Sequence, residues 1–281
     1  MNVDARTQLL GVVGHPVAHS LSPQIHNAAL EHDKRNAIYV GFDVEPDRFD
    51  DFVRGMQALG AQGLNVTLPH KRAAFEACSW ATDDAQATEA VNTIVFDGDE
   101  IVGSNTDVSG VRAALRELGA DFDGATVLLI GAGGAGHAVA YALSVLAKEI
   151  RICNRTPARA DMLRSSIGPT ANVVPWKDVE GALEDVHIVI QTTSVGLDGK
   201  ENPLRKGAIA KAKSCRALLD VVYAPNETAL VRDARKAGIQ AADGLEMLVQ
   251  QAAAAYALFW EEPAPIEVMR RAAHETAGRQ A

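Results

Sequence analysis

Residues 126–136 read Thr-Val-Leu-Leu-Ile-Gly-Ala-Gly-Gly-Ala-Gly, an apolar run that leads directly into a Gly-x-Gly-x-x-Gly turn. The run predicts a buried strand, and residues 137–146 after the turn predict a helix. The first glycine permits the tight bend, the second lets backbone N–H groups approach a pyrophosphate, and the third lets the helix pack closely on its strand. A second apolar strand at residues 149–153 completes a βαβ unit. The stretch therefore predicts a dinucleotide-binding domain with the pyrophosphate at the helix N-terminus.

The end of the second strand indicates which dinucleotide is bound. Asn154-Arg155-Thr156, followed by Arg159, stands where an NAD site usually has a carboxylate for the ribose 2′-hydroxyl. Guanidinium and hydroxyl groups can hold a 2′-phosphate through charge-assisted hydrogen bonds, so NADP is favoured over NAD. In a second interpretation, compatible with the first, Thr156 caps a helix that begins at Pro157 and both arginines are solvated.

Composition narrows the class of protein. A chain of 281 residues, 47% of them hydrophobic, can bury a large core and is expected to form two domains. The formal net charge of -9 argues against a nucleic-acid partner, because binding phosphates requires a basic patch. Three scattered cysteines are typical of a reduced, cytoplasmic protein, and neither a signal peptide nor a membrane span is expected.

Strand patterns alternate with helix patterns, which predicts an α/β protein with mainly parallel sheets. Strands are expected at residues 9–13, 37–42, 63–66, 186–191 and 217–222, with a hairpin at 93–102. Helices are expected at residues 22–30, 49–59, 111–118, 245–260 and 266–274, and after Pro69. The last two helices are expected to pack back onto the first domain. That domain would comprise residues 1–109 and 247–281, and the nucleotide domain residues 110–246.

Polar side chains follow the apolar strands of the first half. Residues 14–23 follow the first strand and residues 65–71 the third, while residues 89–93 precede the hairpin and residues 103–107 follow it. Because the carboxyl ends of strands form the ligand crevice of an open α/β sheet, these groups would suit a small, polyhydroxylated, acidic substrate. Taken singly, Ser22 and Asp107 could be helix caps and Lys71 a solvated charge.

Three early histidines, His15, His19 and His26, raise the question of a metal site. Pro16 and Pro23 interrupt any helical pairing, and no acidic or cysteine ligand is close in the sequence. No metal is therefore expected.

Taken in order, motifs across nearly the whole chain resemble those of the shikimate dehydrogenase family. The matching blocks are Gly14-x-Pro16 through Asn27, Asn65-Val66-Thr67-x-Pro69-x-Lys71, Ala90-Val91-Asn92-Thr93, Gly103-x-Asn105-Thr106-Asp107, Gly131-Ala132-Gly133-Gly134-Ala135, Asn154-Arg155-Thr156, Thr193-Ser194-Val195-Gly196, Tyr223-Ala224-Pro225 and Asp243-Gly244-Leu245 through Gln251. The ordered set is specific, and it overrides the single-residue interpretations of Lys71 and Asp107.

The resemblance implies NADP-dependent, reversible reduction of 3-dehydroshikimate to shikimate in chorismate and aromatic amino-acid biosynthesis. It implies that Lys71 is the acid/base group, paired with Asp107. The implied substrate ligands are Ser20 and Ser22 for the carboxylate, Thr67, Asn92 and Gln251 for the ring hydroxyls, and Tyr223 closing over the ring. The implied NADP contacts are Gly131, Ala132, Gly133, Gly134, Ala135, Asn154, Arg155, Thr156, Arg159, Val221, Gly244 and, more weakly, Asp83.

The chain departs from the family pattern at a few positions. Glu89 stands where a small residue is common, Val108-Ser109 where a glycine often follows Asp107, and Gln191-Thr192 where an Asn-Ala pair is usual. Two rival functions remain. A quinate/shikimate dehydrogenase of broader specificity is disfavoured by Ser22 and Asn154, and a non-catalytic NADP or metabolite sensor has no use for Lys71 and Asp107. A monomer and a homodimer are both compatible with the sequence.

Overall fold

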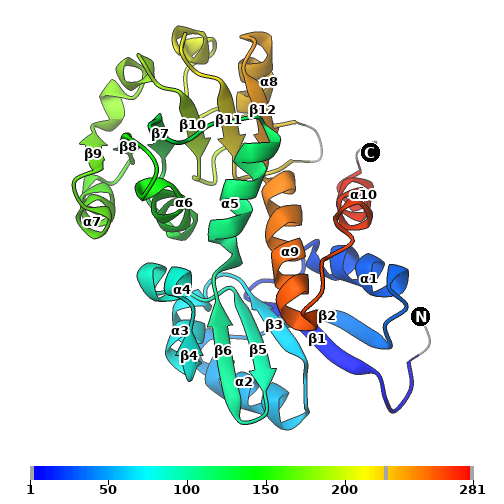
Figure 1. Ribbon diagram of the computed structural model, residues 1–281. Coiled ribbons are helices and arrows are strands. Elements are labelled where there is room, and N and C mark those ends of the chain that lie inside the picture. The colour runs from blue at the N-terminus through cyan, green and yellow to red at the C-terminus, as the bar shows by residue number, and fades with distance from the viewer. Residues whose placement is uncertain (1–2, 225–226, 279–281) are drawn as a thin grey trace. The chain divides into compact units, whose positions relative to one another are not determined.

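The computed structural model describes residues 3–224 and 227–278, and Figure 1 shows the course of the chain. Its contacts divide the chain into two compact units, the first formed by Met1–Thr106 with Val249–Ala281 and the second by Asp107–Leu248. Both divisions fall inside helices, α5 (Thr106–Glu117) and α9 (Gly244–Trp260). The boundaries expected from the sequence, 109/110 and 246/247, fall in the same two helices. Among the described residues, no helix is long and apolar enough to cross a membrane.

The first unit is built on a six-stranded sheet with the order β2-β1-β3-β5-β6-β4. Its strands are β1 (Gln8–Gly14), β2 (Ala37–Asp43), β3 (Gly63–Val66), β4 (Trp80–Ala81), β5 (Thr93–Asp97) and β6 (Glu100–Ser104). Its remaining helices are α1 (Ser22–His32), α2 (Phe49–Ala58), α3 (Lys71–Ala77), α4 (Asp83–Thr88) and α10 (Ile266–Thr276). The pairs β1–β2, β1–β3 and β4–β6 are parallel, whereas β5–β6, the predicted hairpin, and β3–β5 are antiparallel. The sheet is therefore mixed.

Helix α2 illustrates how the sequence pattern produces the packing. Phe49, Val53 and Met56 recur at helical spacing and are all buried. They share one core cluster with Leu64 of β3 and Ile94 of β5. Gly60, which follows the helix with a φ of +69°, ends it in the left-handed conformation that glycine adopts without a steric penalty.

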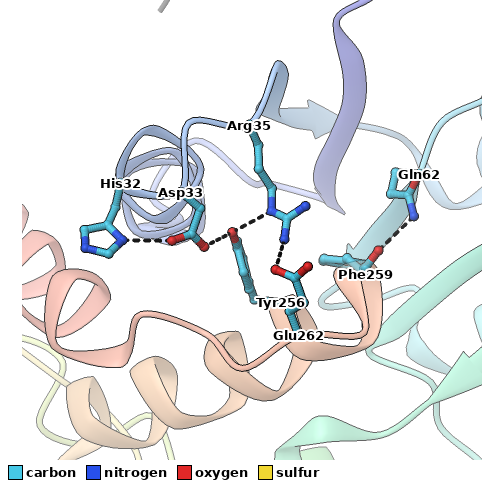
Figure 2. Close-up of polar contacts among 7 residues, drawn as sticks. All are labelled: His32, Asp33, Arg35, Gln62, Tyr256, Phe259 and Glu262. Carbon is cyan, nitrogen blue, oxygen red and sulfur yellow. Dashed lines mark hydrogen bonds and ion pairs between the residues drawn. The ribbon is translucent and has the colours of Figure 1, made fainter.

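The last part of the chain returns to the first unit, as expected from the sequence, and α10 packs beside α1. A polar cluster fastens α9 to the loop between α1 and β2 (Figure 2). Arg35 Nε donates to the Tyr256 hydroxyl at 3.1 Å, and the Arg35 guanidinium lies 4.2 Å from the centre of the Trp260 ring. The Tyr256 hydroxyl donates in turn to Asp33, and Arg35 pairs with Glu262.

The second unit contains a fully parallel six-stranded sheet with the order β12-β11-β10-β7-β8-β9. Its strands are β7 (Thr126–Ile130), β8 (Glu149–Cys153), β9 (Ala171–Val174), β10 (Ile188–Gln191), β11 (Ala217–Asp220) and β12 (Gln240–Asp243). Its helices, besides most of α5, are α6 (Gly134–Ser144), α7 (Pro157–Ile167) and α8 (Ala229–Lys236). Short 3-10 turns occur at Pro46–Arg48 in the first unit and at Trp176–Asp178, Gly181–Leu183 and Ala208–Lys211 in the second.

The strands of the second sheet are buried on both faces. Val127 and Leu129 of β7 belong to one core cluster, while Leu128 and Ile130 belong to another. This alternation follows from the two-residue repeat of a strand and explains the unbroken apolar run in the sequence. The strand order is that of a Rossmann-type domain, in which the crevice for a ligand opens between β7 and β10, where the order reverses.

Candidate active site

The turn after β7 has the backbone that a dinucleotide site requires. Gly131 has a φ of +111°, and a Cβ there would lie 2.5 Å from the Thr192 hydroxyl oxygen. A Cβ on Gly136 would lie 2.6 Å from the Gly131 carbonyl oxygen, so this third glycine lets α6 approach its strand. Gly133 and Gly134 are exposed, and a Cβ on either would meet no atom within 4 Å. With no acidic residue in its first turn, the N-terminus of α6 offers backbone N–H groups to an anion.

The segment after β8 lies against the same turn. Asn154 accepts a hydrogen bond from the Ala132 N–H at 3.1 Å and donates one to the Thr156 carbonyl at 2.8 Å. Arg155 and Arg159 are exposed, and neither pairs with a carboxylate in the part of the chain that the structure describes. Thr156 occupies the N-cap position of α7, but its side chain makes no capping hydrogen bond. The sequence therefore located the helix start correctly, and the Thr156 hydroxyl is not used by the helix.

Two further strand ends meet beside the sheet. The Gly244 N–H donates to the Val222 carbonyl at 3.1 Å, and a Cβ on Gly244 would overlap the carbonyl oxygen of Val221. Only glycine fits this contact, which brings Val221 and Gly244 together. Tyr223 is half-buried. Pro225 of the same motif lies outside the described residues.

These features fit a phosphorylated dinucleotide. Open space lies beside Gly133 and Gly134 at a helix N-terminus, and the second strand ends in two exposed guanidinium groups. The groups that would hold such a ligand lie along the carboxyl edge of the sheet: the glycine turn, Arg155, Arg159, Val221 and Gly244.

In the first unit, the loops after β1 and β3 are held together. The Thr67 N–H donates to the Val13 carbonyl at 2.9 Å, and the His15 N–H donates to the Leu68 carbonyl at 3.0 Å. Gly14 permits this approach, because a Cβ there would lie 2.5 Å from the Thr67 methyl carbon. The structure thus places the loop that carries Ser20 next to the loop that carries Thr67 and leads into α3, which begins at Lys71.

Ser20 and Ser22 lie at the start of α1. The Ser22 N–H donates to the Ser20 hydroxyl oxygen at 3.3 Å. The N-cap of α1 is Leu21 and makes no side-chain capping bond, so the interpretation of Ser22 as a helix cap is wrong. The buried Ser22 hydroxyl instead hydrogen-bonds to the Tyr39 hydroxyl, an interaction that lowers the Tyr39 pKa, although burial raises that pKa by more.

A buried polar network continues from Tyr39 across the sheet. The Tyr39 hydroxyl donates to Asn65 Oδ1 at 2.7 Å, and Asn65 Nδ2 donates to the Thr93 hydroxyl at 3.0 Å. The Thr93 hydroxyl donates to Asn92 Oδ1 at 3.1 Å. Asn92 Nδ2 then lies 3.5 Å from Gln251 Oε1 on α9. Sequence reasoning missed Tyr39, because its place in an apolar strand gave no sign of hydroxyl partners in other segments.

Lys71 and Thr106, the residue before Asp107, are both hydrogen-bonded to the segment Val91–Asn92 of the first unit. Lys71, the half-buried first residue of α3, accepts a hydrogen bond at its carbonyl from the Val91 N–H at 2.9 Å. The Thr106 N–H donates to Asn92 Oδ1 at 2.7 Å. Asp107 follows Thr106 as the second residue of α5, so the interpretation of Asp107 as a helix cap is wrong. Residues 71 and 106 are thereby both attached to the Val91–Asn92 segment.

Two other residues singled out in the sequence lie at the surface. Asp83 is exposed in the first turn of α4. Glu89, with a φ of +47°, pairs with Arg72, which also pairs with Glu76. The departure from the family pattern at Glu89 is thus accounted for by a surface ion pair next to Lys71.

Comparison with protein families and known proteins gives one consistent result. Family models match residues 12–94 (shikimate dehydrogenase substrate binding domain), 112–246 (shikimate / quinate 5-dehydrogenase) and 244–274 (shikimate 5'-dehydrogenase C-terminal domain). A shikimate dehydrogenase (NADP(+)) of Methanopyrus kandleri is 40% identical and is covered over 98% of both chains. One of Acidiphilium cryptum is also 40% identical, over 92% of this chain and 93% of its own.

Solved structures agree with the sequence matches. A shikimate dehydrogenase crystallised with NADP+ superimposes with a TM-score of 0.90 at 34% identity, covering 98% of both chains. The Thermus thermophilus shikimate 5-dehydrogenase in complex with NADP(H) and shikimate gives a TM-score of 0.86 at 33% identity, covering 96% of this chain and 100% of its own. A 5-ketofructose reductase of Gluconobacter gives a TM-score of 0.85 at 27% identity, covering 97% and 100%. The fold is thus shared by enzymes named for different substrates.

Proposed function

The chain belongs to the shikimate dehydrogenase family, and on that premise we propose that it catalyses the reversible, NADP-dependent reduction of 3-dehydroshikimate to shikimate. This reaction is a step in the biosynthesis of chorismate and the aromatic amino acids. The similarity extends over nearly the full length of named shikimate dehydrogenases (NADP(+)). Because a fold alone does not determine the substrate, the residues of the site carry the rest of the proposal.

The observation that carries the proposal is the hydrogen bond between Asn92 and Gln251, two residues that are far apart in the sequence. It brings the carboxamide groups of the segment before β5 and of α9 beside the hydroxyls of Thr93 and Thr106. Asn92, Gln251 and Thr67 are assigned to the ring hydroxyls of the substrate. Such groups can both donate and accept, as a polyhydroxylated ring requires.

Ser20 and Ser22 are assigned to the substrate carboxylate. Both hydroxyls lie at the start of α1, where the helix dipole also favours a negative charge. For Ser22 to donate to a carboxylate, its hydroxyl must turn away from Tyr39, and the Tyr39 hydroxyl keeps its bond to Asn65 when it does so. Tyr223 is assigned to the other side of the substrate.

Bound as NADP+, the cofactor would supply a hydride acceptor for the alcohol, and bound as NADPH it would supply a hydride donor for the ketone. We assign its pyrophosphate to the glycine turn, Gly131, Ala132, Gly133, Gly134 and Ala135. We assign its 2′-phosphate to Arg155, Thr156 and Arg159. Asn154 orients the glycine turn through its bond to Ala132. Val221 and Gly244 are assigned to the nicotinamide end, and Asp83 remains a weaker assignment.

Lys71 is assigned as the acid/base group. A hydride can leave a secondary alcohol only as the hydroxyl proton is removed, and it can return to the ketone only as the carbonyl oxygen is protonated. The neutral Lys71 amine takes that proton during oxidation, and its ammonium returns it during reduction. Asp107 is assigned as the partner of Lys71, because an adjacent carboxylate stabilises and orients an ammonium.

The two parts of the chain divide these tasks. We assign the acid/base pair and the substrate groups other than Tyr223 to residues 1–109 and 247–281, and the NADP groups other than Asp83 to residues 110–246. The protein is proposed to act in the cytoplasm, since its three cysteines are free thiols of which two are buried. A monomer and a homodimer are distinguished by sedimentation of the purified protein.

The direct test is turnover of a substrate panel followed by the absorbance of the reduced nicotinamide. The purified protein is assayed with 3-dehydroshikimate and NADPH, with shikimate or quinate and NADP, and with NADH or NAD in parallel. We expect reduction of 3-dehydroshikimate with a strong preference for NADPH. Comparable rates with quinate would instead indicate the broader quinate/shikimate activity. No turnover with any pair, while NADPH still binds, would indicate a sensor.

A further inference from the structure

A buried carboxyl at the edge of the second sheet has no part in the chemistry assigned above. Asp220 ends β11, and its neighbours in register are Gln191, which ends β10, and Asp243, which ends β12. Asp220 and Gln191 are completely buried. Three polar side chains are thus lined up at the carboxyl ends of neighbouring strands, the edge at which Rossmann-type sheets bind their ligand.

The Gln191 carboxamide organises the turn that follows β10. Its Nε2 donates to the Thr193 carbonyl at 3.1 Å and to the Val195 carbonyl at 2.9 Å, and its Oε1 accepts from the Thr193 N–H. The same Nε2 reaches Asp220 Oδ1 at 3.2 Å. An asparagine here would hold its carboxamide one methylene nearer the backbone, so it could not keep all of these bonds.

The turn held by Gln191 is packed against the glycine turn of the nucleotide site. The Thr192 N–H donates to the Ile130 carbonyl at 2.7 Å, and the Thr192 hydroxyl donates to the same oxygen at 3.1 Å. The Thr192 hydroxyl also occupies the space that a side chain on Gly131 would need. A shift of this turn would therefore displace Thr192, against which the glycine turn packs.

Asp220 anchors a second segment on its other side. Its Oδ1 accepts from the Val222 N–H at 3.3 Å, and its Oδ2 accepts from the Thr228 hydroxyl at 2.7 Å. Thr228 in turn caps α8 by accepting from the Val231 N–H. Val221 and Tyr223, assigned to the nicotinamide and the substrate, flank the anchored residue. One carboxyl group thus joins both loops at the proposed cofactor edge.

We propose that Asp220, acting through Gln191, is a positioning residue for NADP, and that loss of its negative charge weakens NADP binding without altering the chemical step. The proposal rests on the function proposed above, because it takes this sheet edge as the nucleotide site. The hydrogen bonds of Asp220 go to Gln191, Val222 and Thr228, none of which is assigned to the acid/base pair.

The surroundings of Asp220 make its charge variable near neutral pH. Burial, aided by the nearby Asp243 carboxylate, raises the pKa of Asp220 to about 7, while the bonds from Thr228, Val222 and Gln191 oppose this rise. A protonated Oδ2 can donate to the Thr228 oxygen, so the proton is accommodated locally. However, Oδ1 then becomes a weaker acceptor for Gln191 and Val222. NADP binding should therefore weaken as the pH falls below neutrality.

Asp220→Asn tests the proposal, because it has nearly the shape of the protonated acid. NADPH affinity is measured by fluorescence titration without substrate at about pH 6 and about pH 8, on either side of the Asp220 titration. We expect the variant to bind NADPH about tenfold more weakly than the unmodified protein at the higher pH, the scale of one hydrogen bond to a charged group. The two proteins should differ little at the lower pH, and kcat should stay within about threefold.

Controls separate positioning from a general loss of stability. Asp185→Asn removes a charge at the opposite end of β10, at an exposed left-handed position that asparagine tolerates, and should leave both titrations unchanged. Gln191→Asn is a milder change that still tests the link between Asp220 and the turn if Asp220→Asn fails to fold. It should weaken NADPH binding at both pH values. Equal affinity and equal pH dependence in Asp220→Asn and the unmodified protein would overturn the proposal. Absence of shikimate turnover in the unmodified protein would instead overturn the proposed function, since the NADPH titration needs no substrate.

Discussion

Gln251 on α9 and Asn92 before β5 lie with their carboxamides 3.5 Å apart, although 159 positions separate them in the sequence. Asn92 is fixed from the other side by Thr93 and by the Thr106 N–H. A helix that returns from the end of the chain thus completes a set of polar groups laid out by the sheet. Side chains from segments that no local sequence pattern connects are thus brought together in one polar cluster.

Gln251→Leu removes the carboxamide and keeps most of the side-chain volume. We expect the KM for shikimate to rise about tenfold with kcat changed much less, because one hydrogen bond to a ring hydroxyl is lost in the ground state and transition state alike. Steady-state kinetics at saturating NADP measure both constants. Gln240→Leu, at an exposed position of β12, is the matched control. An unchanged KM would remove Gln251 from the substrate site.

Arg155→Asp places a carboxylate where the 2′-phosphate is assigned. The preference for NADP over NAD should fall by about 2 kcal/mol, since a charge-assisted hydrogen bond is replaced by repulsion. The ratio of kcat/KM for the two cofactors measures this effect. Arg159→Asp, in the first turn of α7, should act in the same direction but more weakly. A cofactor preference that stays the same in both variants would mean that neither guanidinium contacts the phosphate.

His26 should make the protein sensitive to acid. It is 1% exposed and stacks on the Tyr39 ring at 4.3 Å, and its Nε2 has no hydrogen-bond partner among the described residues. Burial lowers the pKa of His26 from 6.5 to about 3. Between these two pH values His26 is therefore protonated in the unfolded chain and neutral in the folded protein. Its contribution to stability is therefore complete above pH 6.5 and is lost as the pH falls toward 3.

His26→Phe keeps the stacking and removes the titration. Between pH 6.5 and about pH 5, the unmodified protein should lose about 2 kcal/mol of unfolding free energy that the variant retains. Urea unfolding at the two pH values gives the comparison, and any cost of the larger ring cancels because it is the same at both. An equal loss in both proteins would show that His26 is not responsible.

Arg35 fastens the end of α9 to the first unit (Figure 2). Arg35→Ala removes a hydrogen bond to Tyr256, the contact with the Trp260 ring and a pair with Glu262. We expect unfolding free energy to fall by about 2 kcal/mol, mostly from the first two contacts, because Glu262 is exposed. Arg48→Ala, whose ion-pair partner Asp51 is 3.8 Å away at the surface, should change stability by less than about 0.5 kcal/mol. Equal losses of unfolding free energy in the two variants would mean that the contacts of Arg35 with α9 do not stabilise the protein.

Much of the fold could be predicted from the sequence, because its signals are local. The run at residues 126–136 correctly gave β7, the turn and α6, and the glycine that follows each of several helices marked their ends. The two-residue strand β4 is too short to show a pattern. The strands β9, Ala-Asn-Val-Val, and β12, Gln-Ala-Ala-Asp, were also missed, because polar and small residues interrupt the apolar run that marked the equally short β3, β10 and β11. The antiparallel placement of β5 between β3 and β6 depends on pairing across the sheet, which strand patterns do not specify.

The motifs proposed for the site could be recognised in the sequence, whereas the contacts between them could not. Ser22 was open to interpretation as a cap because serine precedes Pro23, whereas the helix begins one residue earlier and the hydroxyl bonds to Tyr39. Tyr39 and Asp220 lie in apolar strands, and their importance depends on partners from other segments. Such partners become visible only when the strands are in register.

Lys71→Ala gives the most direct test of the reaction assigned to this protein. We expect kcat for reduction of 3-dehydroshikimate by NADPH to fall by about 10³-fold, the cost of losing a general acid/base group. Shikimate should still bind with an affinity within about threefold of that of the unmodified protein, since its carboxylate and two hydroxyl contacts remain. Turnover close to that of the unmodified protein would contradict the assignment of Lys71 and, with it, the proposed mechanism.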